Sequence, residues 1–313
     1  MTRKRGFDTL DSAPQWILAF GGAYLLTHLL VIYVWNNAGP GFSVRGSSGG
    51  TSAFPVTCMA AVGCWLCLLV RRSLPAGAPL RRAWSLFALS AAAQALSGAA
   101  AQLLGSNWML NPLEWGGQAR PGTIEQIHRC ALIVGGPVRL VLLAGGLLVA
   151  LRVLRKFDFW ARPTTGDWAI SAIVYLFALA RFSEAGAASL ASKPTGFEDW
   201  VSLAGLPILC VLVLQATLLR QSVARMGNGL IAKCWLAFMG GIFLTAAGEL
   251  ALWVIPHFTH AWGVEMVEPL IGLPSAALLA LAPAWLVVAQ RRAVKPSSVS
   301  AEDEATRVPV LAR

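Results

Sequence analysis

Charged residues are scarce in this chain of 313 residues. Asp, Glu, Lys and Arg make up 13% of it, and hydrophobic residues make up 56%. Soluble domains average about a quarter charged residues, so a soluble domain is a poor match to this composition. The low charge therefore predicts an integral membrane protein.

Common catalytic motifs are also missing. The sequence has no G-x-x-x-x-G-K-[ST], no HExxH and no G-x-S-x-G, and the serines of "RGSSGG" lie in a stretch whose composition predicts a flexible loop. Haem ligation across a bilayer would need paired histidines within apolar runs, but His28 is the only histidine clearly inside one. These absences favour a non-enzymatic protein and leave any cofactor unspecified.

Long apolar runs are what the sequence has instead. There are eight, at residues 16–35, 53–70, 83–104, 130–151, 168–190, 200–220, 234–255 and 267–290. Each is close to the ~20 residues that an α-helix needs to cross the hydrocarbon layer. A transmembrane barrel would show alternating segments of ~10 residues, and the sequence has none. We therefore predict an all-α, polytopic bundle of eight transmembrane helices.

The basic residues lie mainly at the ends of these runs. Nineteen of the 25 Lys and Arg residues fall on one predicted side and four on the other. By the positive-inside rule the basic side is cytoplasmic, which places both termini in the cytoplasm, in a plasma (inner) membrane. This distribution explains the net charge of +10 without a nucleic-acid partner.

A repeated Trp and Pro pattern divides the eight runs into four pairs. Trp16, Trp84, Trp168 and Trp235 open the odd runs, where tryptophan is expected at the headgroup level, and Pro55, Pro137, Pro207 and Pro274 come early in the even runs. The Trp-to-Pro separations are 39, 53, 39 and 39 residues. The pattern predicts four like-oriented helical hairpins, at about 16–72, 83–156, 168–225 and 234–292.

Three of these prolines follow a glycine by two residues. Proline removes a backbone hydrogen bond and kinks a helix, and glycine allows another helix to approach closely. We expect early-span kinks that either splay the helix tops for packing or surround a shared outward-facing cavity, and the two interpretations are compatible.

Several ionisable residues fall at membrane depth, where they are rare and usually face the protein interior. They lie between the midplane and the outer surface, and they are His28, Arg139, Arg181, Glu184 and Glu249. They are candidates for ligand binding or proton relay. The alternative is structural: the arginines pair with the carboxylates, and the histidine bonds a neighbour.

Histidines and carboxylates also gather near the predicted outer surface. The candidate metal ligands are His128, His257, His260, Glu265 and Glu268. Imidazole and carboxylate together suit Zn, Fe or Mn. No spacing matches a named metal motif, so a solvated loop is the alternative interpretation.

The domain prediction is a cytoplasmic segment at 1–15, a membrane domain at 16–292 and a disordered cytoplasmic tail at 293–313. The leading functional hypothesis is a ligand-binding or sensory module, or a subunit of a membrane complex, with a buried polar site in the outer half. Its partners would be the lipid bilayer and a membrane or cytoplasmic protein. The alternatives are a proton-coupled small-molecule transporter and a membrane metalloenzyme.

Overall fold

The computed structural model describes residues 10–37, 48–105, 121–156, 163–190, 197–226, 229–254 and 268–294. Within these ranges there is no strand, and nearly every residue is helical. The helices are α2 (Ala13–Asn37), α3 (Ser48–Ser73), α4 (Pro79–Gly105), α6 (Pro121–Ile133), η2 (Val134–Val138), α7 (Arg139–Lys156), α8 (Thr165–Leu190), α9 (Phe197–Arg225), α10 (Leu230–Val254), η4 (Glu268–Gly272) and α12 (Leu273–Val294). The all-α prediction is confirmed.

Five helical segments of the described chain are long and apolar enough to cross a membrane. They are Phe54–Ser73, Arg129–Lys156, Leu203–Arg225, Leu230–Ala251 and Leu270–Ala293. A backbone without water must satisfy its polar groups internally, which a helix does. The five segments are consistent with a multi-pass membrane protein, whereas the count of eight spans and the choice of membrane stay predictions.

Six helical columns form a closed ring. α3 packs against α4, α4 against α7, α7 against α9, α9 against α10, α10 against α12, and α12 against α3. The ring therefore consists of two like triplets, α3–α4–α7 and α9–α10–α12. Within each triplet the helices follow one another in the chain, apart from the α6 and η2 segments that lead into α7 and the η4 segment that leads into α12.

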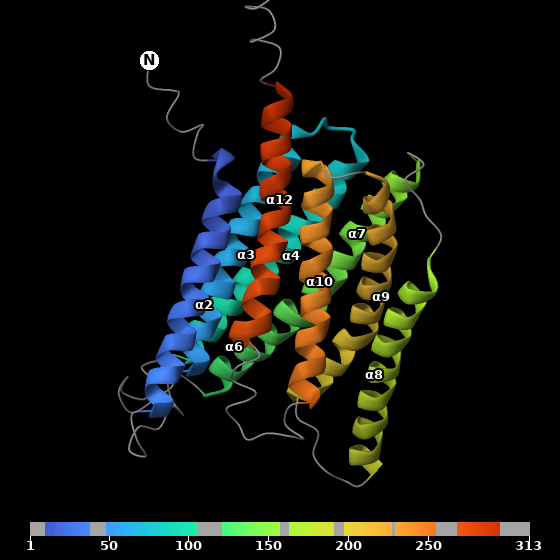
Figure 1. Ribbon diagram of the computed structural model, residues 1–313. Helices are drawn as coiled ribbons and strands as arrows, with labels where there is room; N and C mark the ends of the chain where they lie inside the picture. Colours follow the sequence, from blue (N-terminus) through green and yellow to red (C-terminus); the bar gives the residue numbers. More distant parts are fainter. Residues whose placement is uncertain are drawn as a thin grey trace, which may run out of the picture.

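Two helices lie outside this ring. α2 packs mainly on α12 and only slightly on α3, and α8 packs on α9. In Figure 1 these two helices flank the bundle on opposite sides, and the start of α2 and the end of α12 lie at the same end of it. α2 and α3 have few contacts, and the four-hairpin arrangement stays a prediction.

Close helix contacts depend on glycine at two positions in the first triplet. A Cβ atom added to Gly98 of α4 would collide with the side chain of Thr57 on α3, and one added to Gly146 of α7 would collide with the ring of Phe87. Small residues allow membrane helices to pack by van der Waals contact at short axial distances. These glycines therefore set how closely the helices of the ring approach.

The four tryptophans of the repeat do not share one environment. Trp16 and Trp168 are 68% and 58% exposed, as an interfacial position requires, but Trp84 and Trp235 are 0% and 4% exposed. The prediction of headgroup anchoring is wrong for this second pair. The rings of Trp84 and Trp235 lie 6.1 Å apart, and those of Phe87 and Phe238 lie 4.5 Å apart. The aromatic pairs of α4 and α10 meet across the ring because both helices belong to it.

The predicted kinks have a described counterpart at one proline. Pro137 lies in the π-helical segment η2, and the backbone leaves helical geometry at Gly136, with φ −93° and ψ −106°. The π-helical segment η4 ends at Gly272, two residues before Pro274. Pro55 and Pro207 lie inside α3 and α9, and kinks at these two prolines stay a prediction.

Candidate functional site

Arg139 stands at the first residue of α7, directly after the irregular backbone of η2. Its N–H donates to the carbonyls of Gly136 and Val134. Its own carbonyl accepts a hydrogen bond of 3.0 Å from the Ser90 hydroxyl on α4. Because Pro137 has no N–H and interrupts the regular ladder, the bond from α4 helps to fix where the Arg139 side chain begins.

The guanidinium of Arg139 is incompletely bonded. Its Nε is buried and has no hydrogen-bond partner among the described residues. Glu249 of α10 is close enough to interact with it electrostatically, and Glu249 interacts in the same way with Arg181 of α8. Three helices that are remote in sequence therefore bring two cations to one carboxylate.

Arg181 has a second carboxylate as a neighbour. One of its terminal nitrogens lies 3.3 Å from a carboxylate oxygen of Glu184, one turn further along α8. The four side chains are therefore two arginines and two carboxyl groups. A group balanced in this way can admit an anion if Glu249 gives up its interaction with an arginine or takes up a proton. We call Arg139, Arg181, Glu184 and Glu249 the polar site.

Four of the five candidates for ligand binding or proton relay thus belong to one group. The fifth, His28, lies on α2, and its side chain is outside the described residues. Their functional role stays a prediction.

The side chains of the candidate metal ligands fall outside the part of the chain that the structure describes. His257, His260 and Glu265 lie outside the described residues, and so do the side chains of His128 and Glu268. Among the side chains that the structure does describe, no group of three His, Cys, Asp or Glu residues could hold a metal ion. The metal hypothesis therefore stays a prediction about the segment 255–267 and its neighbours.

Comparison with known proteins finds no matching family model, no similar curated protein and no similar solved structure. Functional inference for this chain therefore comes from its own side chains.

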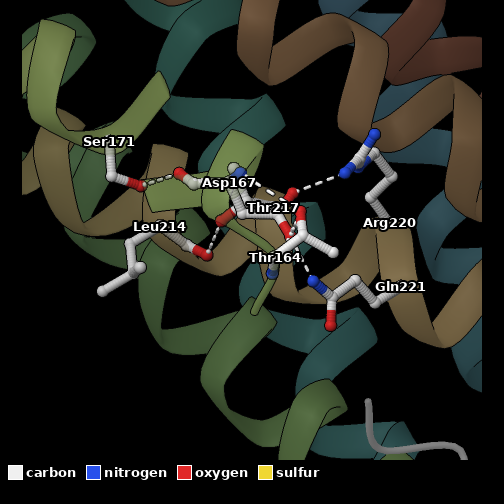
Figure 2. Close-up of polar contacts among 7 residues, drawn as sticks. All are labelled: Thr164, Asp167, Ser171, Leu214, Thr217, Arg220 and Gln221. Carbon is white, nitrogen blue, oxygen red and sulfur yellow. Dashed lines mark hydrogen bonds and ion pairs between the residues drawn. The ribbon is translucent and has the colours of Figure 1, made fainter. Parts of the chain in front are cut away.

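A second polar cluster joins α8 to α9 at the opposite end of α8 from Arg181. Asp167 is 1% exposed, and Figure 2 shows side chains from both helices converging on it. Its Oδ1 accepts a hydrogen bond of 2.7 Å from Arg220, and its Oδ2 accepts one from Gln221. Oδ2 also accepts two hydrogen bonds from Thr164, one of 2.8 Å from its N–H and one of 2.7 Å from its hydroxyl. We call these four residues the Asp167 clasp.

The clasp contains a helix cap. The Thr164 hydroxyl accepts a hydrogen bond of 3.4 Å from the Asp167 N–H, while the Asp167 carboxylate accepts one from the Thr164 N–H. This reciprocal pair is a capping box, which satisfies two backbone donors at a helix start. The same carboxylate therefore caps the start of α8 and binds this helix to α9.

Hydrogen bonding decides the charge of the clasp. Burial tends to raise the pKa of Asp167, but donors from Thr164, then Gln221 and Arg220, outweigh it and lower this pKa below its ordinary value. Each donor stabilises the ionised form. Asp167 is therefore a carboxylate at neutral pH.

Sequence reasoning missed Asp167, because the search was for charges at membrane depth and Asp167 precedes the apolar run. A local signal was available: Thr164-x-x-Asp167 before an apolar run is the pattern of a capping box. The partners Arg220 and Gln221 lie more than fifty residues away, and no local pattern points to them.

Proposed function

We propose that this chain is a non-enzymatic membrane module that binds a small anionic ligand at the polar site, as a sensor or as a subunit of a membrane complex. The observation that carries the proposal is the buried, unbonded Nε of Arg139. A buried donor without a partner costs about 1–3 kcal/mol, and more when it is charged. A ligand that accepts from this nitrogen would remove that cost.

Arginine fits an anionic group better than any other side chain. Its planar fork donates two parallel hydrogen bonds to a carboxylate or phosphate. Glu249 is the carboxylate that interacts with Arg139 in the structure. We expect the ligand to compete with Glu249 for the guanidinium.

Thermal unfolding of the detergent-purified protein tests this, with inorganic phosphate, acetate and succinate as probes. We expect at least one probe to raise the Tm saturably, because a ligand that binds only the folded state stabilises it. Arg139→Gln should abolish the shift. Arg152→Gln, at an exposed position of the same helix, should leave it intact.

Glu249→Gln gives a prediction of opposite sign. Removing the competing carboxylate should tighten binding of the same probe by roughly tenfold, the effect of about 1.4 kcal/mol. Anion binding would be refuted if no probe shifted the Tm, or if Arg139→Gln and Arg152→Gln behaved alike.

A proton-coupled transporter is the second candidate, and the observation that favours it is Glu249. This carboxylate lies in a candidate membrane span and interacts with arginines of two other helices, so a change in its protonation would change both interactions. An uptake assay in proteoliposomes distinguishes the transporter from the sensor or subunit. Proton-driven uptake of the bound anion that Glu249→Gln abolishes would support transport, and binding without uptake would support a sensor or subunit.

A further inference from the structure

α8 differs from the six columns of the ring in how it is held. It packs on α9 from outside the ring, and its large side chains point mostly outward. The exposed ones are Trp168, Ile170, Ile173, Tyr175, Leu176, Leu179 and Phe182. Lipid tails are as apolar as these side chains, so burying them against protein gives little driving force for association in a membrane. Specific contacts must therefore decide where α8 lies.

Three groups of contacts attach α8 to the bundle. At its start, the Asp167 clasp binds Arg220 and Gln221 of α9. In its middle, Phe177 and Ala178 pack on Leu203 and Leu206, Val174 packs on Leu209, Val213 and Ala246, and the Cys210 sulfur lies 3.8 Å from the Val174 carbonyl. One turn beyond Phe177, Arg181 interacts with Glu249.

The clasp and Arg181 belong to one rigid element. They are 14 residues apart, which is about 21 Å along an α-helix at 1.5 Å per residue. A shift or rotation of α8 at the clasp would therefore move Arg181 relative to Glu249. The apolar contacts in the middle come from Phe177, Ala178 and the partly buried Val174. Because apolar contacts are non-directional, the directional hydrogen bonds of the clasp set the rotation.

We propose that Asp167 is a positioning residue of the polar site, which acts through α8 to hold Arg181 opposite Glu249. The effect on ligand binding rests on the function proposed above, whereas the effect on the seating of α8 does not. Asp167 touches no ligand in this scheme. The hydrogen bonds that it accepts from Arg220 and Gln221 of α9 fix the axial and rotational position of the helix that carries Arg181.

Cys210 supplies a native reporter of this seating. Because its sulfur contacts the α8 backbone, separation of α8 from α9 would expose it to N-ethylmaleimide. Cys234 of α10 is fully buried in the ring and serves as an internal control for global unfolding. Peptide-level mass spectrometry of the whole protein measures both thiols in one experiment.

The test compares Asp167→Asn with a matched control, Asp11→Asn. Asp11 also faces an arginine, Arg291 of α12, at 3.9 Å, but it does not contact α8. Asp167→Asn should speed alkylation of Cys210 by roughly fivefold and weaken binding of the phosphate, acetate or succinate probe by a similar factor, since loss of one charge-assisted bond is worth about 1 kcal/mol or more. Asp11→Asn should change neither rate nor affinity.

Arg220→Gln repeats the test with the Thr164 cap left intact, in case Asp167→Asn also exposes Cys234. A double-mutant cycle completes it: in an Arg181→Gln background, Asp167→Asn should weaken the probe no further, because coupled residues are not additive. The proposal is overturned if Arg220→Gln leaves Cys210 as slow as in the wild type, or if the two substitutions add independently. If no probe binds the wild type, the proposed function fails, and the alkylation rates still decide whether the clasp seats α8.

Discussion

The two polar clusters to which α8 contributes, one at its start and one around Arg181, are built in opposite ways. At the Asp167 clasp, the carboxylate is 1% exposed and both of its oxygens accept hydrogen bonds. At the polar site, Arg139 keeps a buried Nε without a partner. A buried polar network that is satisfied rigidifies a structure, and one that is partly satisfied is costly. Gln221 of the clasp also keeps a buried Oε1 without a partner among the described residues, so the contrast lies in the charged groups: both oxygens of the Asp167 carboxylate are bonded, whereas the Arg139 Nε is not. The comparison indicates that the clasp serves structure and that the polar site can take a further partner.

Removal of the Asp167 side chain should have the largest effect on stability. Asp167→Ala takes away a helix cap and leaves Gln221 and Arg220 without their acceptor, so we expect a loss of about 2–3 kcal/mol. Because Arg220 is 47% exposed and can turn to water, the loss should not exceed this range. Thermal unfolding in detergent measures it, with Asp11→Ala as control. A change in Tm no larger than that of the control would remove the distinction between the two sites.

Acid should erase part of this difference. The pKa of Asp167 is lowered on folding, so its charge contributes stability above the unfolded-state value of about 3.9, and that contribution is lost as the pH falls through the lower folded-state value. The charged partner facing it is Arg220. The Tm difference between wild type and Asp167→Asn should be constant from about pH 5 to 8 and shrink below about pH 4. A difference that instead fades near neutral pH would argue against this assignment.

At the polar site, substitution should affect ligand binding more than stability. Arg139→Met replaces an incompletely bonded cation by an apolar chain of similar length, so we expect an unfolding free energy within about 1 kcal/mol of the wild type or above it. Binding of the anionic probe should weaken more than about tenfold. Tm and probe titration on the same samples give both numbers. Large destabilisation with unchanged affinity would make Arg139 structural.

The hydrogen bond from α4 should have the smallest effect. Ser90→Ala frees the Arg139 carbonyl, and we expect about threefold weaker probe binding, in line with a net hydrogen bond of about 0.5–1 kcal/mol. Ser275→Ala is the matched control, because its hydroxyl donates 2.8 Å to the Gly241 carbonyl between α12 and α10, the equivalent pair of the second triplet. Equal effects of the two substitutions on affinity would show that Ser90 does not help to place Arg139.

The helices and the members of the polar site were largely predictable. Apolar runs of about 20 residues form helices, because a helix satisfies the hydrogen bonds of its backbone N–H and C=O groups within one segment. Charges are rare enough in such runs that Arg139, Arg181 and Glu249 stand out. Their grouping was not predictable, because depth along a helix says nothing about which helix lies alongside. The contacts of the Asp167 clasp with α9 were not predictable for the same reason, since Arg220 and Gln221 are recognisable as partners only once α9 is placed against α8.

The sequence by itself determined the apolar helices, the place of each ionisable residue along its helix and the break before Arg139, because each of these follows from local chemistry along one segment. The tertiary structure alone decided which helices form the ring and which lie outside it. Trp84 and Trp168 open apolar runs in the same way, yet one is buried and the other 58% exposed. The difference comes from the neighbours: α4 is a column of the ring and packs on both α3 and α7, whereas α8 lies outside the ring and packs mainly on α9.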